Sequence, residues 1–232
     1  MPSKRKTNAN KTEQNMNYAF QPIYDTRTDI LTVYGREALM RPSGTTPGEY
    51  IEQMIGENRS HELEYSTFVN SVRQFAERGY SEKLFINSLP YEFLNEDEIE
   101  EFDNLCDSLG ISEIVVENLE YGNQFDFQKM SKKIQTLRKH GYKIALDDFG
   151  SGINSVDALE LIKPDIVKID RYFVSGCLRN DICKNTVEII VNSLRPYGVG
   201  ILAEGVETKE EFDFLKKLHV DFMQGYYLGY PE

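Results

Sequence analysis

Short runs of apolar residues alternate along the chain with longer segments in which apolar residues recur every three or four positions. The short runs predict β-strands and the longer segments predict amphipathic helices. The predicted strands are Ala19–Ile23, Ile30–Ala38, Leu84–Asn87, Ile114–Glu117, Lys143–Asp147, Ile166–Ile169, Val199–Ala203 and Asp221–Gln224. The apolar faces of three predicted helices are Glu62, Tyr65, Phe68, Val69, Val72 and Phe75; Phe127, Met130, Ile134 and Leu137; and Val187, Ile190, Val191 and Leu194.

The alternation of strands and helices favours an α/β fold in which crossover helices join parallel strands. Residues 24–29 alone separate the first two predicted strands, so we expect a hairpin there and an antiparallel first strand. With about eight strands, the pattern predicts a (β/α)₈ TIM-like barrel. An open doubly wound sheet is the alternative, although no glycine-rich phosphate loop follows the first strand.

The chain has 232 residues and a net charge of −12. This length suits one barrel domain, which we place at residues 18–232. Residues 1–17 contain no aliphatic β-branched residue and are predicted to form a flexible basic tail. The acidity argues against a nucleic-acid polymer or an anionic membrane as partner, because such surfaces are bound by basic residues. An anionic ligand would need metal ions between itself and the protein.

Cysteine use and hydropathy favour a cytoplasmic protein. The three cysteines, Cys106, Cys177 and Cys183, are too few for a disulfide framework and show no CxxC spacing. No apolar run approaches the ~18 residues of a membrane span. The basic N-terminus is not followed by the apolar segment of a secretory signal.

Polar residues stand where several predicted strands end. Each of them alone is more often a helix N-cap, a turn residue or a surface residue. In a parallel barrel, however, the strand ends share the face that carries the active site.

Clustered carboxylates repel one another, and oxygen ligands of this kind suit Mg²⁺, Mn²⁺ or Ca²⁺ better than zinc. Paired cations of this class hydrolyse phosphodiesters. The residues are Glu37, Asn87, Glu117, Asp147, Asp148, Lys168 and Glu204.

A set of short motifs occurs in a fixed order between Tyr18 and Pro231. The motifs are FQPIYD (20–25), REALMR (36–41), FIN (85–87), ENLE (117–120), LDDFGSG (146–152), KPDIVKID (163–170), AEGVET (203–208) and QGYYLGYP (224–231). In this order they resemble the EAL domain, the bacterial phosphodiesterase of cyclic di-GMP. The resemblance implies a barrel with an antiparallel first strand, a homodimer, and two Mg²⁺ or Mn²⁺ ions that activate a water to open cyclic di-GMP to linear pGpG.

The resemblance also assigns a role to individual residues. Glu204 would act as general base or place the water, and Lys168 would hold that water or the phosphate charge. Glu120 and Glu207 would support the site. The implied metal ligands are Glu37, Asn87, Glu117, Asp147 and Asp148. The implied substrate contacts are Gln21, Arg41 and Gln224, and Tyr226 and Tyr227 could stack on guanine.

The chain departs from the family pattern after Arg41. The segment PSGTTPGEYIE that follows is about half a dozen residues shorter than usual, and the chain has no tryptophan. The departure concerns substrate affinity more than chemistry, since every implied metal ligand is in place. Two alternatives to an active phosphodiesterase therefore stand: a non-catalytic receptor of cyclic di-GMP, and a protein-binding regulator.

Overall fold

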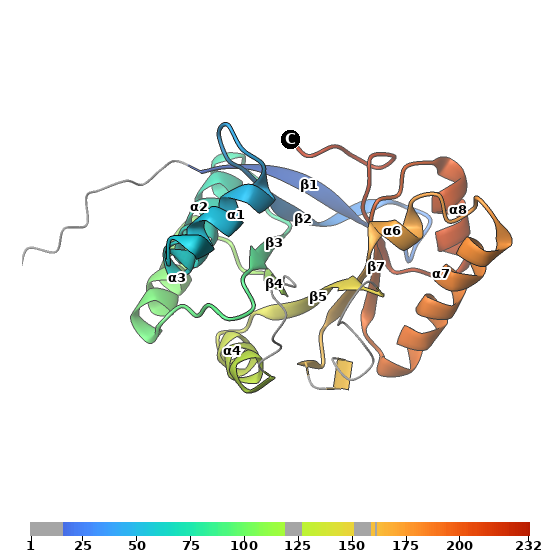
Figure 1. The fold of residues 1–232 in the computed structure, drawn as a ribbon. Helices are drawn as coiled ribbons and strands as arrows, with labels where there is room; N and C mark the ends of the chain where they lie inside the picture. The colour runs from blue at the N-terminus through green and yellow to red at the C-terminus, as the bar shows by residue number, and fades with distance from the viewer. Residues whose placement is uncertain (1–15, 119–126, 151–158, 161) are drawn as a thin grey trace, which may run out of the picture.

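Eight strands close into a barrel in the computed structural model, which describes residues 16–118, 127–150, 159–160 and 162–232. The strands follow one another around the barrel in chain order, as Figure 1 shows from the side. The predicted (β/α)₈ barrel is therefore confirmed. The strands are β1 (Asn17–Asp25), β2 (Thr32–Arg41), β3 (Lys83–Ser88), β4 (Ile114–Asn118), β5 (Lys143–Phe149), β6 (Ile166–Ile169), β7 (Gly200–Ala203) and β8 (Phe222–Met223).

The first strand runs against both of its neighbours. β1 pairs antiparallel with β2 and with β8, whereas the pairs from β2 to β8 are parallel. The predicted hairpin is thus confirmed, but the prediction that its second strand begins at Ile30 is wrong. Ile30 is 75% exposed and lies with Leu31 in the loop before Thr32, because the hairpin tip projects beyond the barrel and has nothing to pack against. Of the predicted tail, only Met16 and Asn17 are described, and Asn17 already belongs to β1.

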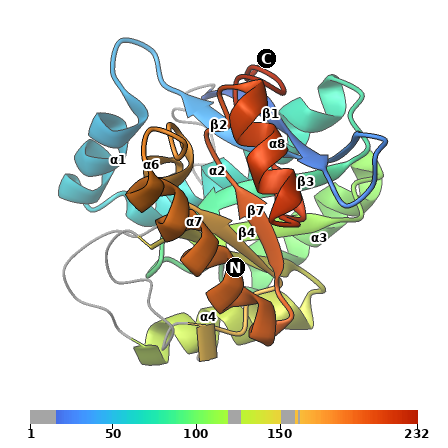
Figure 2. The same ribbon diagram turned by 90° about the vertical axis from the view of Figure 1, so that its right-hand side faces the viewer.

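Helices cover the outside of the barrel. In Figure 1, α1, α2 and α3 lie to the left of the barrel and α7 and α8 to the right; Figure 2, seen from that right-hand side, has α7 and α8 in front. Most of the apolar core lies between strands and helices and includes Phe20, Phe68 and Phe102. The helices are α1 (Pro47–Gly56), α2 (Ser60–Glu77), α3 (Glu96–Leu109), α4 (Phe127–Lys139), α6 (Arg171–Val174), α7 (Asp181–Leu194), the 3₁₀ turn η1 (Arg195–Tyr197) and α8 (Lys209–Lys217).

The buried face of α2 differs from the prediction at its start. Glu62 is exposed and forms an ion pair with Arg59, whereas Leu63 and Glu64 are buried. Further along the helix, Phe68 and Phe75 are buried as predicted. Apolar spacing cannot identify a buried carboxylate such as Glu64, so the prediction that Glu62 lies on the buried face is wrong.

Inside the barrel, a layer of apolar side chains is followed, toward the carboxyl ends of the parallel strands, by a layer of polar ones. Strand side chains alternate in direction, so a residue two positions beyond an inward-facing one faces inward again. The apolar layer is Ile23, Phe85, Val115, Ala145, Ile166, Leu202 and Phe222. Two positions further along the parallel strands, and two positions earlier on β1, stand Gln21, Asn87, Glu117, Asp147, Lys168, Glu204 and Gln224. The polar layer therefore lies at the carboxyl ends of the parallel strands.

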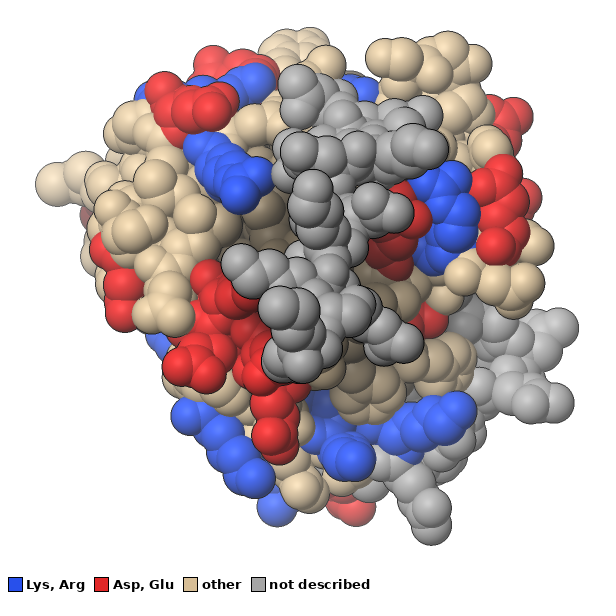
Figure 3. Space-filling model, turned by 90° about the vertical axis from the view of Figure 1, so that its left-hand side faces the viewer, with Lys and Arg blue, Asp and Glu red and all other residues tan. Residues whose placement is uncertain are grey.

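Charged residues on the described surface are mixed in sign. Figure 3 shows the side of α1 to α3, where groups of Lys and Arg are separated by acidic and uncharged side chains. Within the described ranges, no helix is both long enough and apolar enough to cross a bilayer.

Candidate functional site

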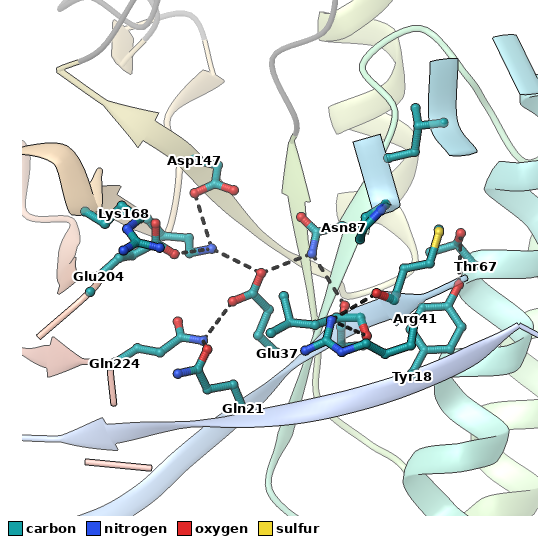
Figure 4. Close-up of a pocket in the computed structure, with 18 of the residues that line it drawn as sticks. Tyr18, Gln21, Glu37, Arg41, Thr67, Asn87, Asp147, Lys168, Glu204 and Gln224 are labelled. Carbon is teal, nitrogen blue, oxygen red and sulfur yellow. Dashed lines mark hydrogen bonds and ion pairs between the residues drawn. The ribbon is translucent and has the colours of Figure 1, made fainter. Parts of the chain in front are cut away.

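A cavity of about 380 Å³ opens at the carboxyl ends of the parallel strands. Its volume lies within the range of small-molecule sites. One side is polar, with Glu37, Asn87, Asp147, Lys168, Glu204 and Gln224 in its lining. The other side is largely apolar and is formed by Met40, Pro47, Ile51, Leu63 and Leu89. Figure 4 shows the polar side chains pointing toward one another from different strands.

Lys168 stands at the centre of the polar side. It is 1% exposed, and its Nζ lies 2.7 Å from Glu204 Oε1 and 3.2 Å from Asp147 Oδ1. The same nitrogen lies 3.0 Å from Glu117 Oε1 and 3.7 Å from Glu37 Oε1. One buried ammonium therefore faces four carboxylates, and the cluster holds more negative than positive charge.

Two amides hold Glu37 in the barrel, and a third amide contacts one of them. Asn87 Nδ2 donates to Glu37 Oε1 at 3.1 Å, and Gln224 Nε2 donates to Glu37 Oε2 at 2.8 Å. Gln21 Oε1 accepts from Gln224 Nε2 at 3.3 Å. The structure thus brings together side chains from β1, β2, β3 and the residue after β8, which lie far apart in the sequence.

The surroundings of Glu117 test whether the site fits a cation. It is fully buried, and neither of its carboxylate oxygens has a hydrogen-bond partner among the described residues. The Nζ of Lys168 is near but is not aligned as a hydrogen-bond donor. Burial of an ionised carboxylate is costly unless a charge and hydrogen bonds compensate it. A divalent cation would supply that compensation, so the donor set fits the metal that the resemblance implies.

An irregularity in β5 lets two consecutive aspartates face the same side. In a regular strand, Asp147 and Asp148 would point to opposite faces. Here the pairing with β6 shifts between Leu146 and Phe149, and Asp148 takes a left-handed backbone conformation with φ of 52°. One oxygen from each aspartate and one from Glu204 consequently lie within 4.8 Å of one another. Strained backbone of this kind is found at functional sites.

The pKa values in the cluster reflect burial and the excess of acids. Burial raises the pKa of Glu117 well above its ordinary value, and the neighbouring charge of Glu37 adds to this. Burial likewise raises the pKa of Asp147, and that of Glu204 to about 8. Burial alone would lower the pKa of Lys168, but the surrounding carboxylates outweigh it and raise the value. For Glu37, Lys168 and the amide donors outweigh burial and hold the pKa below its usual range.

The remaining predicted residues lie in or near the cavity. Arg41 lines it, and its Nη1 donates to the Met40 carbonyl at 3.0 Å. Glu207 also lines it, and its backbone N–H donates to Glu211 Oε2, within the capping box that begins α8. Tyr226 is part of the lining, whereas Tyr227 is not among the lining residues. Glu120 lies outside the described residues.

Arg171 is a charged cavity residue that the sequence did not predict. Arg171 lines the cavity directly after Asp170, the N-cap of α6, and its Nη2 lies 3.4 Å from Glu207 Oε1. Its position, just beyond the end of β6, was the available signal. An arginine at the mouth of an acidic cavity can hold a phosphate in a forked contact.

The sequence profile described as the EAL domain matches residues 5–231 of this chain. Among curated relatives, a probable cyclic di-GMP phosphodiesterase of Escherichia coli, PdeN, is 29% identical over 224 residues, which is 92% of this chain and 43% of the relative. The E. coli cyclic di-GMP phosphodiesterase PdeL is 35% identical over 130 residues, or 55% of this chain and 36% of the relative. The chain thus matches less than half the length of these relatives.

Two solved structures share the fold. A standalone EAL protein from Vibrio cholerae O395, in its cyclic di-GMP-bound form, has a TM-score of 0.83 and 26% identity, and covers 94% of this chain and 92% of its own. Klebsiella pneumoniae BlrP1, in a complex with manganese and cyclic di-GMP, has a TM-score of 0.77 and 26% identity over 94% of this chain and 56% of its own.

Proposed function

Because the chain belongs to the EAL domain family, we propose that it is a metal-dependent phosphodiesterase that hydrolyses cyclic di-GMP to linear pGpG. The observation that carries the proposal is the buried carboxylate cluster around Lys168, in which Glu117 has no hydrogen-bond partner among the residues that the structure describes. The relatives named as cyclic di-GMP phosphodiesterases, and the similar folds solved with that dinucleotide, support the choice of substrate.

Five residues would hold two ions of Mg²⁺ or Mn²⁺. When bound, the ions would supply charge neutralisation of the phosphate and a hydroxide-like water at neutral pH. The manganese complex of BlrP1 supports this choice of metal. Oxygen donors from carboxylates and one amide match the preferences of these hard cations. The ligands are Glu37, Asn87, Glu117, Asp147 and Asp148.

The chain's other residues would bind substrate and manage protons. Glu204 is within reach of the cavity and would accept the proton of the attacking water or orient that water. Lys168, placed among the ligands, would stabilise the charge that develops on the phosphate. Gln21, Arg41 and Gln224 line the cavity and would contact the dinucleotide, with Glu207 supporting the wall beside them.

Turnover of cyclic di-GMP is the direct test. With Mg²⁺ or Mn²⁺ present, we expect purified protein to convert the substrate to pGpG, and we expect EDTA to stop the reaction. Replacing Glu204 with alanine should lower kcat by about 10²- to 10⁴-fold, the usual contribution of a general base. Chromatography of the nucleotides measures both. If calorimetry instead finds tight cyclic di-GMP binding with no product, the chain is a receptor and the proposed activity is wrong. If neither turnover nor binding occurs, the protein-binding alternative is favoured.

The proposal includes a homodimer in the cytoplasm, with neither a nucleic-acid polymer nor a membrane as partner. An apolar strip on α7 supports self-association: Ile182 and Ile189 are 78% and 68% exposed and lie two turns apart on one helix face. We expect the double variant Ile182→Glu/Ile189→Glu to sediment as a monomer, because charges on this strip would oppose its burial against a second copy. Ile55→Glu, at an exposed apolar position of α1, serves as the control. A wild-type protein that is already monomeric at micromolar concentration would contradict the proposed dimer.

A further inference from the structure

An ion pair is buried behind β3, on the side opposite the polar layer of the barrel. Lys133 of α4 and Glu64 of α2 are 3% and 2% exposed, and Lys133 Nζ lies 2.9 Å from Glu64 Oε1. Neither residue belongs to the proposed metal and catalytic set. Removing two charges from water is costly, and an apolar pair of similar size is often at least as stable. A gain in stability therefore does not explain why this ion pair is buried.

Among the described residues, the hydrogen bonds that this ion pair makes to other residues go to Ser88 and Leu89 at the end of β3. Lys133 Nζ donates to Ser88 Oγ at 2.6 Å and also to the Leu89 carbonyl. The Ser88 hydroxyl and the Leu89 backbone N–H donate in turn to the carboxylate of Glu64, the second of these at 2.8 Å. Two helices thus hold the same two consecutive residues through side-chain and backbone atoms.

Asn87 directly precedes Ser88 and Leu89 in the chain. Because side chains alternate along a strand, Ser88 points outward to α2 and α4 while Asn87 points into the barrel. There, Asn87 Nδ2 donates to Glu37 Oε1 at 3.1 Å. Hydrogen bonds are directional, and in a low dielectric they fix geometry more strongly than apolar contacts do. Holding Ser88 and Leu89 therefore fixes the position and direction of the Asn87 side chain.

We propose that Glu64 and Lys133 are positioning residues for the divalent-cation site, acting through Ser88 and Leu89 on Asn87. The inference rests on the proposed function in one respect, namely that Asn87 is a metal ligand. Loss of a residue that orients a metal ligand typically weakens metal binding by about 10- to 100-fold. Glu64 is one of the residues that line the cavity, whereas Lys133 is not, and neither residue is among the proposed cation ligands.

The test is the Mn²⁺ affinity of the substrate-free protein, measured by electron paramagnetic resonance of free Mn²⁺. The double variant Glu64→Gln/Lys133→Met removes both charges together and keeps the volume and a hydrogen-bonding amide, so no unpaired buried charge remains. We expect its Mn²⁺ dissociation constant to rise about 10- to 100-fold. Lys132→Met, at the neighbouring exposed position of α4, should bind Mn²⁺ as the wild type does.

A second control separates positioning from general loss of stability. Val191→Ala opens a cavity in the core beside α7, on another side of the barrel, and lowers Tm without touching β3. If Val191→Ala weakens Mn²⁺ binding as much as the double variant does, or if the double variant binds like the wild type, the positioning role is overturned. If the wild type itself binds no Mn²⁺, the proposed metal site fails first and the positioning role fails with it.

Discussion

Replacing Lys168 with methionine should lower the thermal stability of the metal-free protein by on the order of 10 °C. The substitution removes the ammonium that lies within 4 Å of four carboxylates and leaves those acids facing one another. Removing one partner of a buried ion pair typically costs about 3–5 kcal/mol, and in a domain of this size each kcal/mol shifts Tm by roughly 2–4 °C. Calorimetry in EDTA measures the loss.

Divalent cations should restore most of that stability. A cation that binds only the folded state stabilises it by mass action, by ~2.7 kcal/mol at one hundred times its Kd. Without Lys168 to compete for the same carboxylates, the gain in Tm on adding Mn²⁺ should be larger in the variant than in the wild type. Lys209→Met is the control, since its ion pair with Asp213 is exposed and worth little. Equal gains in the variant and the wild type would show that Lys168 and the metal do not share ligands.

The barrel was predictable because its strands carry a strong and regular signal. From β3 to β8, each strand has an inward apolar residue followed two positions later by a polar one, as in Phe85 and Asn87 or Val115 and Glu117. The short loop between the first two strands set the antiparallel direction of β1. Strand ends were less predictable, because Ile30 is apolar but belongs to a projecting hairpin tip.

The composition of the site was also predictable, but its geometry was not. The sequence indicated that acids gather at the strand ends, and the motif order indicated which ones. It could not show that Asp148 faces the same side as Asp147, since that depends on an irregular pairing between β5 and β6. Nor could it show that Lys168 is wholly buried among the acids rather than at their edge.

The ion pair between Glu64 and Lys133 marks another limit of the sequence. Both residues lie on helices rich in charged side chains, where one more acid or base looks like solvated surface. Their burial follows from how α2 and α4 pack against the end of β3, which no local pattern records. Tertiary contacts made by polar residues therefore cannot be predicted from local sequence patterns.

Replacing Glu117 with glutamine should stabilise the metal-free protein while removing its activity. The carboxylate is fully buried and has no hydrogen-bond partner in the described part of the chain, and burial raises its pKa, which disfavours its charged form. An amide of the same shape cannot ionise, so it removes the cost of a charge at this buried position and leaves Lys168 with three acidic neighbours. Relief of such functional strain typically gains roughly 0.5–2 kcal/mol.

The same substitution should abolish stabilisation by Mn²⁺, because a neutral amide cannot offset the charge of a cation as a carboxylate does. Turnover of cyclic di-GMP should fall by more than ~10- to 100-fold, which is the usual effect of losing a residue that only orients a metal ligand. Thermal unfolding with EDTA and with Mn²⁺, together with the pGpG assay, measures both effects. Glu100→Gln, at an exposed position of α3, should change neither. A Glu117→Gln protein that is less stable than the wild type in EDTA would show that Glu117 stabilises the fold through Lys168. In that case the missing hydrogen bonds would not indicate a site built for a cation.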